Sequence, residues 1–208
     1  MARETTSGKP PGRPRSSIDA AVFAATLRTV DELGYTRATV DRIAAAAGIA
    51  KTTIYRRWPS KGELITACLV DTFGPWRPEG RDREEIISAA VRLAAAKISE
   101  PGVGAAFAGV FADAVNDPAL REVLSARLQD PFLHALKEAL GEPEDRVLFL
   151  IDVAVGTLLH RMGMTGEPMV ESDVDALVGL LLSPREIRSA EQTPQDSDPD
   201  GARAGFRV

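Results

Sequence analysis

Hydrophobic residues recur every three or four positions along most of this 208-residue chain, the spacing that places them on one face of an α-helix. The segment 18–33 shows the pattern first. Its apolar side chains share one broad helical face, while Arg28, Asp31 and Glu32 lie on the opposite side. No alternation of apolar and polar residues lasts long enough to indicate a β-strand. The pattern therefore predicts an all-α protein.

Residues that cap or stop helices divide the first third of the chain. Thr39 and Ser60 are favourable N-cap residues, whereas Gly34 and Gly48 favour helix ends and Pro59 stops a helix. The expected helices cover residues 18–33, 40–47, 51–58 and 61–73. A segment rich in Gly and Pro, 74–80, follows them and predicts a loop.

Longer helices are expected after this loop, near residues 81–99, 103–116, 118–140, 144–164 and 171–183. Both ends of the chain are rich in Pro, Gly and polar residues, so we expect them to be mobile. The resulting organisation is a basic arm over 1–16, a three-helix helix-turn-helix head over 17–66, a larger helical domain for ligand binding and dimerisation over 67–183, and a tail over 184–208.

The net charge of −5 is divided unevenly between the head and the rest of the chain. Residues 1–60 carry ten Lys or Arg and five Asp or Glu, a net charge of +5, which leaves −10 for residues 61–208. A basic end on an acidic chain is typical of a protein that binds polyanionic DNA with that end.

The segment 39–61 has the composition of a helix-turn-helix. Small residues such as Ala44 and Ala47, with a turn at Gly48, allow two helices to cross closely. Ile43 and Ile54 supply a small core between them. The second helix then presents many hydrogen-bond donors for a DNA groove and its phosphates. These donors are Lys51, Thr52, Thr53, Tyr55, Arg56 and Arg57.

This segment resembles the TetR family of regulators over about residues 18–66. The resemblance rests on Gly34-Tyr35, Thr39-Val40, Ile43-Ala44, Ala47-Gly48, Lys51-x-Thr53-Ile54-Tyr55, Trp58-Pro59-Ser60-Lys61 and Leu64. It implies a helical homodimer that binds double-stranded operator DNA, with a ligand cavity in each C-terminal domain and an operator affinity that ligand alters.

The same resemblance implies roles for individual side chains. Thr39, Tyr55 and Lys61 match phosphate contacts, and the residues nearest base edges are Lys51, Thr52, Thr53 and Arg56. Two positions depart from the family pattern. Ala50 replaces a frequent capping Ser, which costs the recognition helix about 1 kcal/mol. Gly62 replaces a usual acid.

The arm Gly12-Arg13-Pro14-Arg15 precedes the first helix. It resembles a minor-groove hook, in which Arg13 and Arg15 enter a narrow groove rich in A·T pairs. The alternative is a solvated basic tail.

Two segments near the C-terminal end predict the dimer interface. Residues 147–159 are apolar around almost the whole helix, and residues 170–182 repeat this more weakly. A four-helix bundle with the partner's two helices would bury both faces, whereas complete burial in one subunit is the alternative. The expected interface residues are Leu150, Val153, Leu158, Val174, Leu177, Val178 and Leu181.

The middle helices carry the expected effector site. Large residues there predict an apolar pocket, although each of them also suits an ordinary core. The expected lining is Trp76, Leu93, Phe107, Phe111, Leu128, Phe132, His134, His160 and Met162. No Cys or carboxylate cluster accompanies the two histidines at metal-ligand spacing, so we expect neither a metal nor another cofactor.

These patterns together favour a ligand-responsive regulator, most simply a repressor released from its operator by a small apolar molecule. The alternatives are an activator and an architectural DNA-binding protein without an effector. An enzyme is not expected, because no phosphate-binding loop, zinc-protease motif or nucleophile elbow occurs. The apolar runs are too short for a membrane span, no secretory signal begins the chain, and Cys68 is a single cysteine. A cytoplasmic location is therefore expected.

Overall fold

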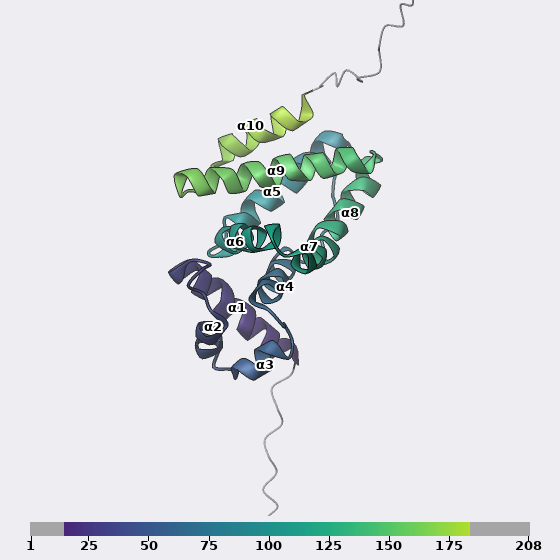
Figure 1. Cartoon of the computed structure of the whole chain (residues 1–208). Coiled ribbons are helices and arrows are strands. Elements are labelled where there is room, and N and C mark those ends of the chain that lie inside the picture. The colour runs from purple at the N-terminus through teal and green to yellow at the C-terminus, as the bar shows by residue number, and fades with distance from the viewer. Residues whose placement is uncertain (1–14, 184–208) are drawn as a thin grey trace, which may run out of the picture.

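The computed structural model describes residues 15–183, and every regular element within that range is helical (Figure 1). The elements are α1 (Arg15–Leu33), α2 (Val40–Ala47), α3 (Lys51–Tyr55), α4 (Lys61–Phe73), α5 (Arg83–Ile98), α6 (Val103–Val115), α7 (Pro118–Leu124), η1 (Ser125–Gln129), α8 (Asp130–Leu140), α9 (Glu144–Thr165) and α10 (Glu171–Leu182). The all-α prediction is confirmed, and most predicted helices agree with the structure to within two or three residues.

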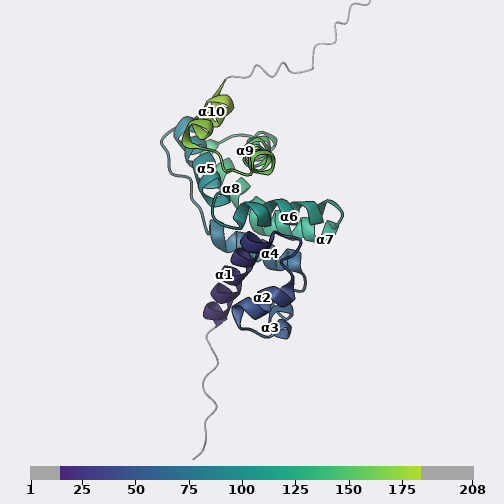
Figure 2. The same ribbon diagram turned by 90° about the vertical axis from the view of Figure 1, so that its left-hand side faces the viewer.

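A head formed by α1, α2, α3 and the start of α4 lies at one end of the molecule (Figures 1 and 2). Its core is small and fully apolar, with Ile43, Ile54 and Leu64 almost completely buried. The ring of Phe23 from α1 packs on Trp58 at a centroid distance of 5.3 Å. Trp58 therefore anchors the chain just after α3 to α1, and the head is held together by side chains from all four helices.

The turn between α2 and α3 follows from its sequence. The Thr39 hydroxyl accepts a bond from the amide of Arg42 at the start of α2, and Gly48 adopts a φ of 64° at its end. Ala50 offers α3 no side-chain cap, as expected. The third helix is shorter than predicted: it ends at Tyr55, whereas the sequence predicted an end near Trp58. Proline disfavours helical geometry in the residue before it, so Pro59 restricts Trp58.

The remaining helices form a larger body, and α4 runs from the head into it (Figure 2). Residues 118–140 are helical throughout, as predicted, but they are not one regular α-helix: the structure divides them into α7, the π-helical turn η1, and α8. Pro131 lies in the first turn of α8 and has no amide hydrogen to donate to the preceding turn. The regular ladder of hydrogen bonds therefore cannot continue through this point.

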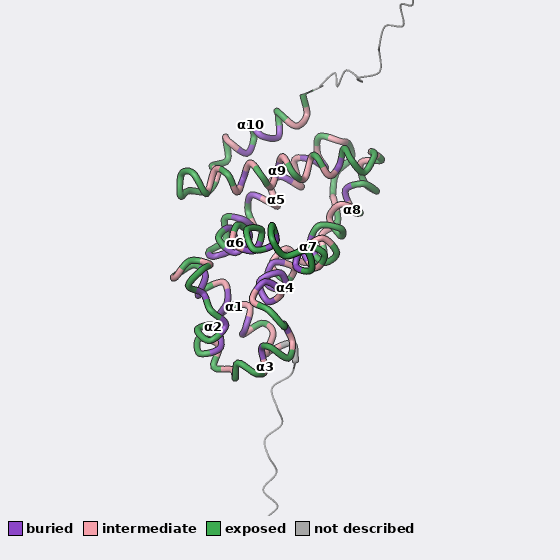
Figure 3. The backbone as a smooth tube through the Cα atoms, viewed as in Figure 1, coloured by how far each residue is buried: buried purple, intermediate pink, exposed green. Residues whose placement is uncertain are grey.

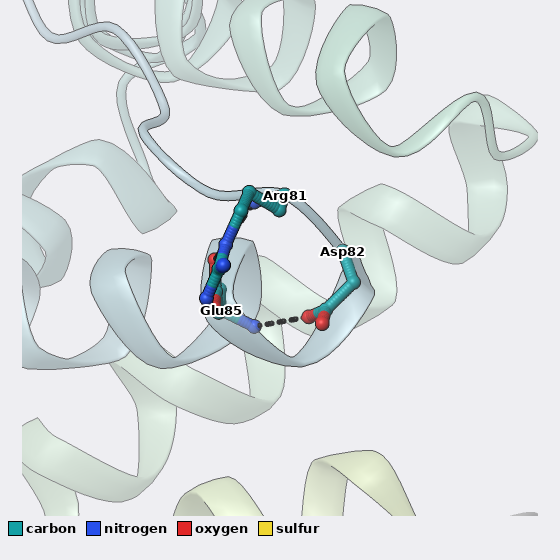
Figure 4. Close-up of polar contacts among 3 residues, drawn as sticks. All are labelled: Arg81, Asp82 and Glu85. Atoms are coloured by element: carbon teal, nitrogen blue, oxygen red, sulfur yellow. Dashed lines mark hydrogen bonds and ion pairs between the residues drawn. The ribbon is translucent and has the colours of Figure 1, made fainter.

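The loop after α4 ends where Asp82 caps α5 (Figure 4). The Asp82 carboxylate accepts a hydrogen bond from the amide of Glu85 at 2.9 Å. Arg81 forms an ion pair with Glu85 at 2.6 Å on the same turn. This cap fixes the point at which the chain enters the body.

Burial is uneven across the body (Figure 3). The main core lies between α4, α5, α6 and the inner sides of α9 and α10. Only Val147, Ala154 and Leu158 of α9 are buried, although the helix is strongly apolar. By length and composition alone, α9 is long and apolar enough to cross a membrane. A helix in the core of a soluble protein can have the same length and composition.

Candidate DNA-binding face and ligand cavity

The short helix α3 presents a polar face at the end of the head, far from α9 and α10 (Figure 1). Lys51, Thr52 and Arg56 are exposed, Tyr55 is 41% exposed, and Thr53 is half-buried. The apolar Ile54 points the other way and is buried in the head core. The structure therefore brings together the residues that the sequence assigned to base reading, on α3 and at its C-cap Arg56.

Lys51 is held toward α2 by an ion pair. Its ammonium lies 2.7 Å from the Asp41 carboxylate and 5.6 Å from the centre of the Tyr55 ring. The hydrogen bond to Asp41 raises the pKa of Lys51. The lysine is therefore a charged donor, with its position set by both helices of the motif.

Two predicted DNA contacts, Arg57 and Lys61, have partners within the protein. Arg57 forms an ion pair with Asp19 of α1 and lies over Trp58. The Lys61 ammonium donates to the backbone carbonyl of Tyr35 at 3.0 Å and lies 3.6 Å from the centre of its ring. Burial lowers the pKa of Lys61. Arg57 thus connects the segment after α3 to α1, and Lys61 connects the start of α4 to the turn after α1.

The predicted arm is described only at its last residues. Arg15 is the first residue of α1, so the helix begins three residues before the predicted Ile18. Arg13 lies outside the described residues, as does the predicted tail over 184–208. Thr39 is exposed beside α2, with its hydroxyl serving as the N-cap.

Tyr35, in the turn after α1, joins the head to α6 of the body. Its hydroxyl donates a hydrogen bond to the carboxylate of Asp113. Its ring lies against Gly109, where any Cβ atom would overlap the ring. Burial and the carboxylate of Asp113 raise the pKa of Tyr35, so the phenol stays protonated and donates. Lys61, which also lies over this ring, completes a contact between α4, the turn and α6.

The body contains an apolar cavity of about 300 Å³ between α4, α5, α6, α8 and α9. Six of the nine predicted effector-site residues line it: Trp76, Leu93, Phe107, Phe111, Leu128 and Phe132. The other three predictions are wrong. His134 and His160 are exposed on the outer sides of their helices, and Met162 packs over Gly104 of α6.

Five aromatic rings form a continuous series along this cavity. Phe111 meets Phe107 edge-on at 5.2 Å, and Phe107 meets Phe73 edge-on at 5.6 Å. Phe73 then meets Phe132 at 5.6 Å, and Trp76 stacks on Phe132 at 5.7 Å. The series connects the end of α4 to α6 and α8, so a bound molecule would touch three helices through aromatic surface.

Several lining residues were not predicted from the sequence. Phe73 ends the helix expected over 61–73 and was not among the predicted lining residues, and Leu136 and Leu140 extend the spacing begun by Phe132. That spacing of four residues was a usable signal. Asp152 was missed because α9 was assigned to the dimer interface. Gln129 was missed because the π-helical turn that positions it has no sequence pattern of its own.

The structure also corrects the predicted dimer interface. Leu158, Val174, Leu177 and Val178 are buried within one subunit, because α10 packs on α5 and α9 turns its buried side inward. The remaining three, Leu150, Val153 and Leu181, are partly buried against the same core. The exposed large apolar residues of these two helices are Phe149, Met164 and Leu180, at 56%, 73% and 62%.

A helix-turn-helix head joined to a helical body with a ligand-sized cavity defines a DNA-binding transcriptional regulator. The family models agree. Residues 22–68 match "Bacterial regulatory proteins, tetR family", and residues 83–181 match "Tetracyclin repressor-like, C-terminal domain". The chain belongs to the TetR family.

Individual relatives support the assignment over most of the chain. The uncharacterized HTH-type transcriptional regulator Rv1556 of Mycobacterium tuberculosis is 31% identical over 85% of this chain and 91% of the relative. A protein of Mycobacteroides abscessus named DNA-binding transcriptional repressor TetR is 31% identical over 78% and 90%. The solved structure of FadR from Bacillus halodurans, a fatty acid degradation regulator, has a TM-score of 0.63 at 17% identity and covers 83% of this chain and 97% of its own.

Proposed function

We propose that this protein is a homodimeric transcriptional repressor that leaves its operator when a small, largely apolar effector enters the cavity. The M. abscessus relative carries the name of a repressor, which favours repression over activation. A body with a cavity of about 300 Å³ favours an effector-responsive protein over an architectural one. Because its partner is operator DNA, we propose a cytoplasmic location.

The observation that carries this proposal is that two helices touch both the cavity and the head. Phe73 at the end of α4 lines the cavity, while Lys61 at the start of α4 bonds to Tyr35. Phe107 of α6 lines the cavity, while Asp113 of the same helix accepts the bond from Tyr35. A shift of either helix on ligand binding would therefore move the head.

The exposed face of α3 supports a division of roles on DNA. Lys51, Thr52, Thr53 and Arg56 lie on the side that a major groove would meet, where they would donate hydrogen bonds to base edges. The phosphate contacts that we propose are Thr39 and Tyr55. Two heads of a dimer must meet grooves roughly 34–36 Å apart, so a movement of a few Å spoils the fit.

The outer sides of α9 and α10 support dimerisation. Phe149 and Leu180 are exposed there, and no atom lies within 4 Å of a Cβ built at Gly156, Gly163 or Gly179. A glycine inside a helix costs about 1 kcal/mol relative to alanine, and nothing within the subunit requires these three. A partner helix that approaches closely would account for both features.

The experiment that tests this function begins with footprinting of the purified full chain on DNA flanking its own coding sequence. Binding of the protected fragment is then measured for the wild type and for Lys51→Ala, with Glu138→Gln on α8 as a control outside the head. Lys51→Ala should weaken binding and blur the preference at particular base pairs, while Glu138→Gln binds normally. The proposal would be contradicted if Lys51→Ala and Glu138→Gln bound the operator with equal affinity and bound unrelated DNA with equal affinity.

A further inference from the structure

Asp41 is the one acidic residue in the helix-turn-helix segment 39–61, which carries five lysines and arginines. It lies in the first turn of α2, two residues after Thr39, and its side chain is 66% exposed. The helices α2 and α3 lie together at the end of the head that is farthest from α10 (Figures 1 and 2). A carboxylate at this end repels DNA phosphates, so its presence in a basic motif requires an explanation.

The Asp41 carboxylate pairs with Lys51, the first residue of α3. The charged groups are 2.7 Å apart, and within residues 15–183 neither side chain forms another ion pair. The Lys51 ammonium also lies 5.6 Å from the centre of the ring of Tyr55, a residue that we propose to contact a phosphate. Lys51 is therefore held between an acid of α2 and an aromatic ring of α3, and Asp41 lies beside a proposed base-reading side chain.

We propose that Asp41 is a positioning residue that sets operator specificity through Lys51. This inference rests on the proposed function and specifies how its base reading is achieved. At the operator, Lys51 donates to a base edge from its place beside Asp41, so the ion pair is kept. On other sequences the ammonium gains most by reaching a phosphate, which leaves the carboxylate unpaired against the polyanion. An unpaired charge that DNA covers is costly, so Asp41 penalises unrelated DNA more than the operator.

The test measures binding of the full-length protein to the footprinted operator and to a duplex with the same bases in scrambled order. Asp41→Asn keeps the shape of the side chain and removes its charge. It should tighten binding to the scrambled duplex by about 5-fold and change operator affinity by less than about twofold, because Lys51 is then free to reach a phosphate. The salt dependence of binding to the scrambled duplex should also steepen by about one unit of slope.

A double variant shows whether Asp41 acts through Lys51. When Asp41→Asn is added to Lys51→Ala, both affinities should change by the same factor, because no ammonium remains to be positioned. Asp41→Glu retains the charge and should retain the preference for the operator. Glu32→Gln is the matched control, because Glu32 is an exposed acid of α1 that forms no ion pair in the described part of the chain. This control should change neither affinity.

Three outcomes would overturn this role of Asp41. They are an equal change on both duplexes in Asp41→Asn, the same loss of preference with and without Lys51, and a loss in Asp41→Glu as large as in Asp41→Asn. The proposed function is tested separately by Lys51→Ala alone. If that variant lowers the preference for the operator while Asp41→Asn leaves it unchanged, Lys51 reads bases without Asp41, and only the positioning role is overturned. If Lys51→Ala leaves the preference unchanged, base reading by Lys51 fails as well.

Discussion

Replacement of Tyr35 by phenylalanine should weaken the connection between head and body by a measurable amount. The substitution keeps the ring against Gly109 and under Lys61, and removes only the hydroxyl that donates to Asp113. A hydrogen bond to a charged group is worth about 1.5–3 kcal/mol. Asp113 is exposed, so we expect the substitution to lower the free energy of unfolding by less than this, about 1 kcal/mol.

The assay is equilibrium unfolding in urea at fixed protein concentration, since dimerisation makes stability depend on concentration. With an m-value of about 2–3 kcal/mol/M, the midpoint should fall by roughly 0.3–0.5 M. Asp113→Ala should give a similar loss. The double variant should cost little more than either single one, because both remove the same bond, and the coupling energy should be about 1 kcal/mol.

Tyr55→Phe provides the control for removal of a tyrosine hydroxyl, because the Tyr55 side chain is exposed on α3 and forms no bond to the body. Its midpoint should match the wild type. Additive losses from Tyr35→Phe and Asp113→Ala would mean that the hydroxyl and the carboxylate stabilise the protein independently, and that no hydrogen bond between them connects the head to the body.

Three further predictions concern packing, pH and assembly. Gly102→Ala should destabilise by about 1–3 kcal/mol in urea unfolding, because Gly102 has a φ of 78° and its Cβ would overlap the backbone carbonyl oxygen of Leu27. Burial raises the pKa of Cys68 from 9.0 to about 12, so unfolding releases a proton between these values. The free energy of unfolding should therefore fall by up to about 1.4 kcal/mol per pH unit above pH 9. Cys68→Ala should flatten this slope in melts measured at several pH values. An unchanged slope in the variant would contradict the role of Cys68. Leu180→Glu should yield folded monomers in sedimentation, whereas Val115→Glu, an equally exposed control on α6, stays dimeric.

The helices of the head could be predicted because their ends are set by local chemistry. Thr39 and Ser60 accept hydrogen bonds from amides three residues later, and Gly48 ends α2 in the left-handed conformation. Each has the capping role that the sequence predicted. The interruption at η1 was missed because the hydrophobic spacing over 118–140 continues through it. Pro131 was the available signal, since proline inside a helical pattern removes a bond in the preceding turn.

The site was predicted less completely, because side-chain partners depend on distant parts of the chain. Nothing near Arg57 in the sequence indicates that Asp19 pairs with it, and nothing near Lys61 indicates the carbonyl of Tyr35. Gly62 shows the same limit. It lies where α4 packs on α7, and a Cβ atom there would have to displace the end of the Leu120 side chain, a contact that the sequence near Gly62 does not indicate.

If the cavity and the DNA-binding face share one equilibrium, binding at one must weaken binding at the other by the same factor. The affinity of a small apolar compound that binds the cavity is measured by calorimetry with and without saturating operator, and operator affinity is measured with and without saturating compound. Linkage requires both ratios to be equal, and coupling of about 1–3 kcal/mol predicts a weakening of roughly 5–150-fold in each direction. A compound that binds the cavity with the same affinity in the presence and absence of operator would contradict release of the operator by an effector.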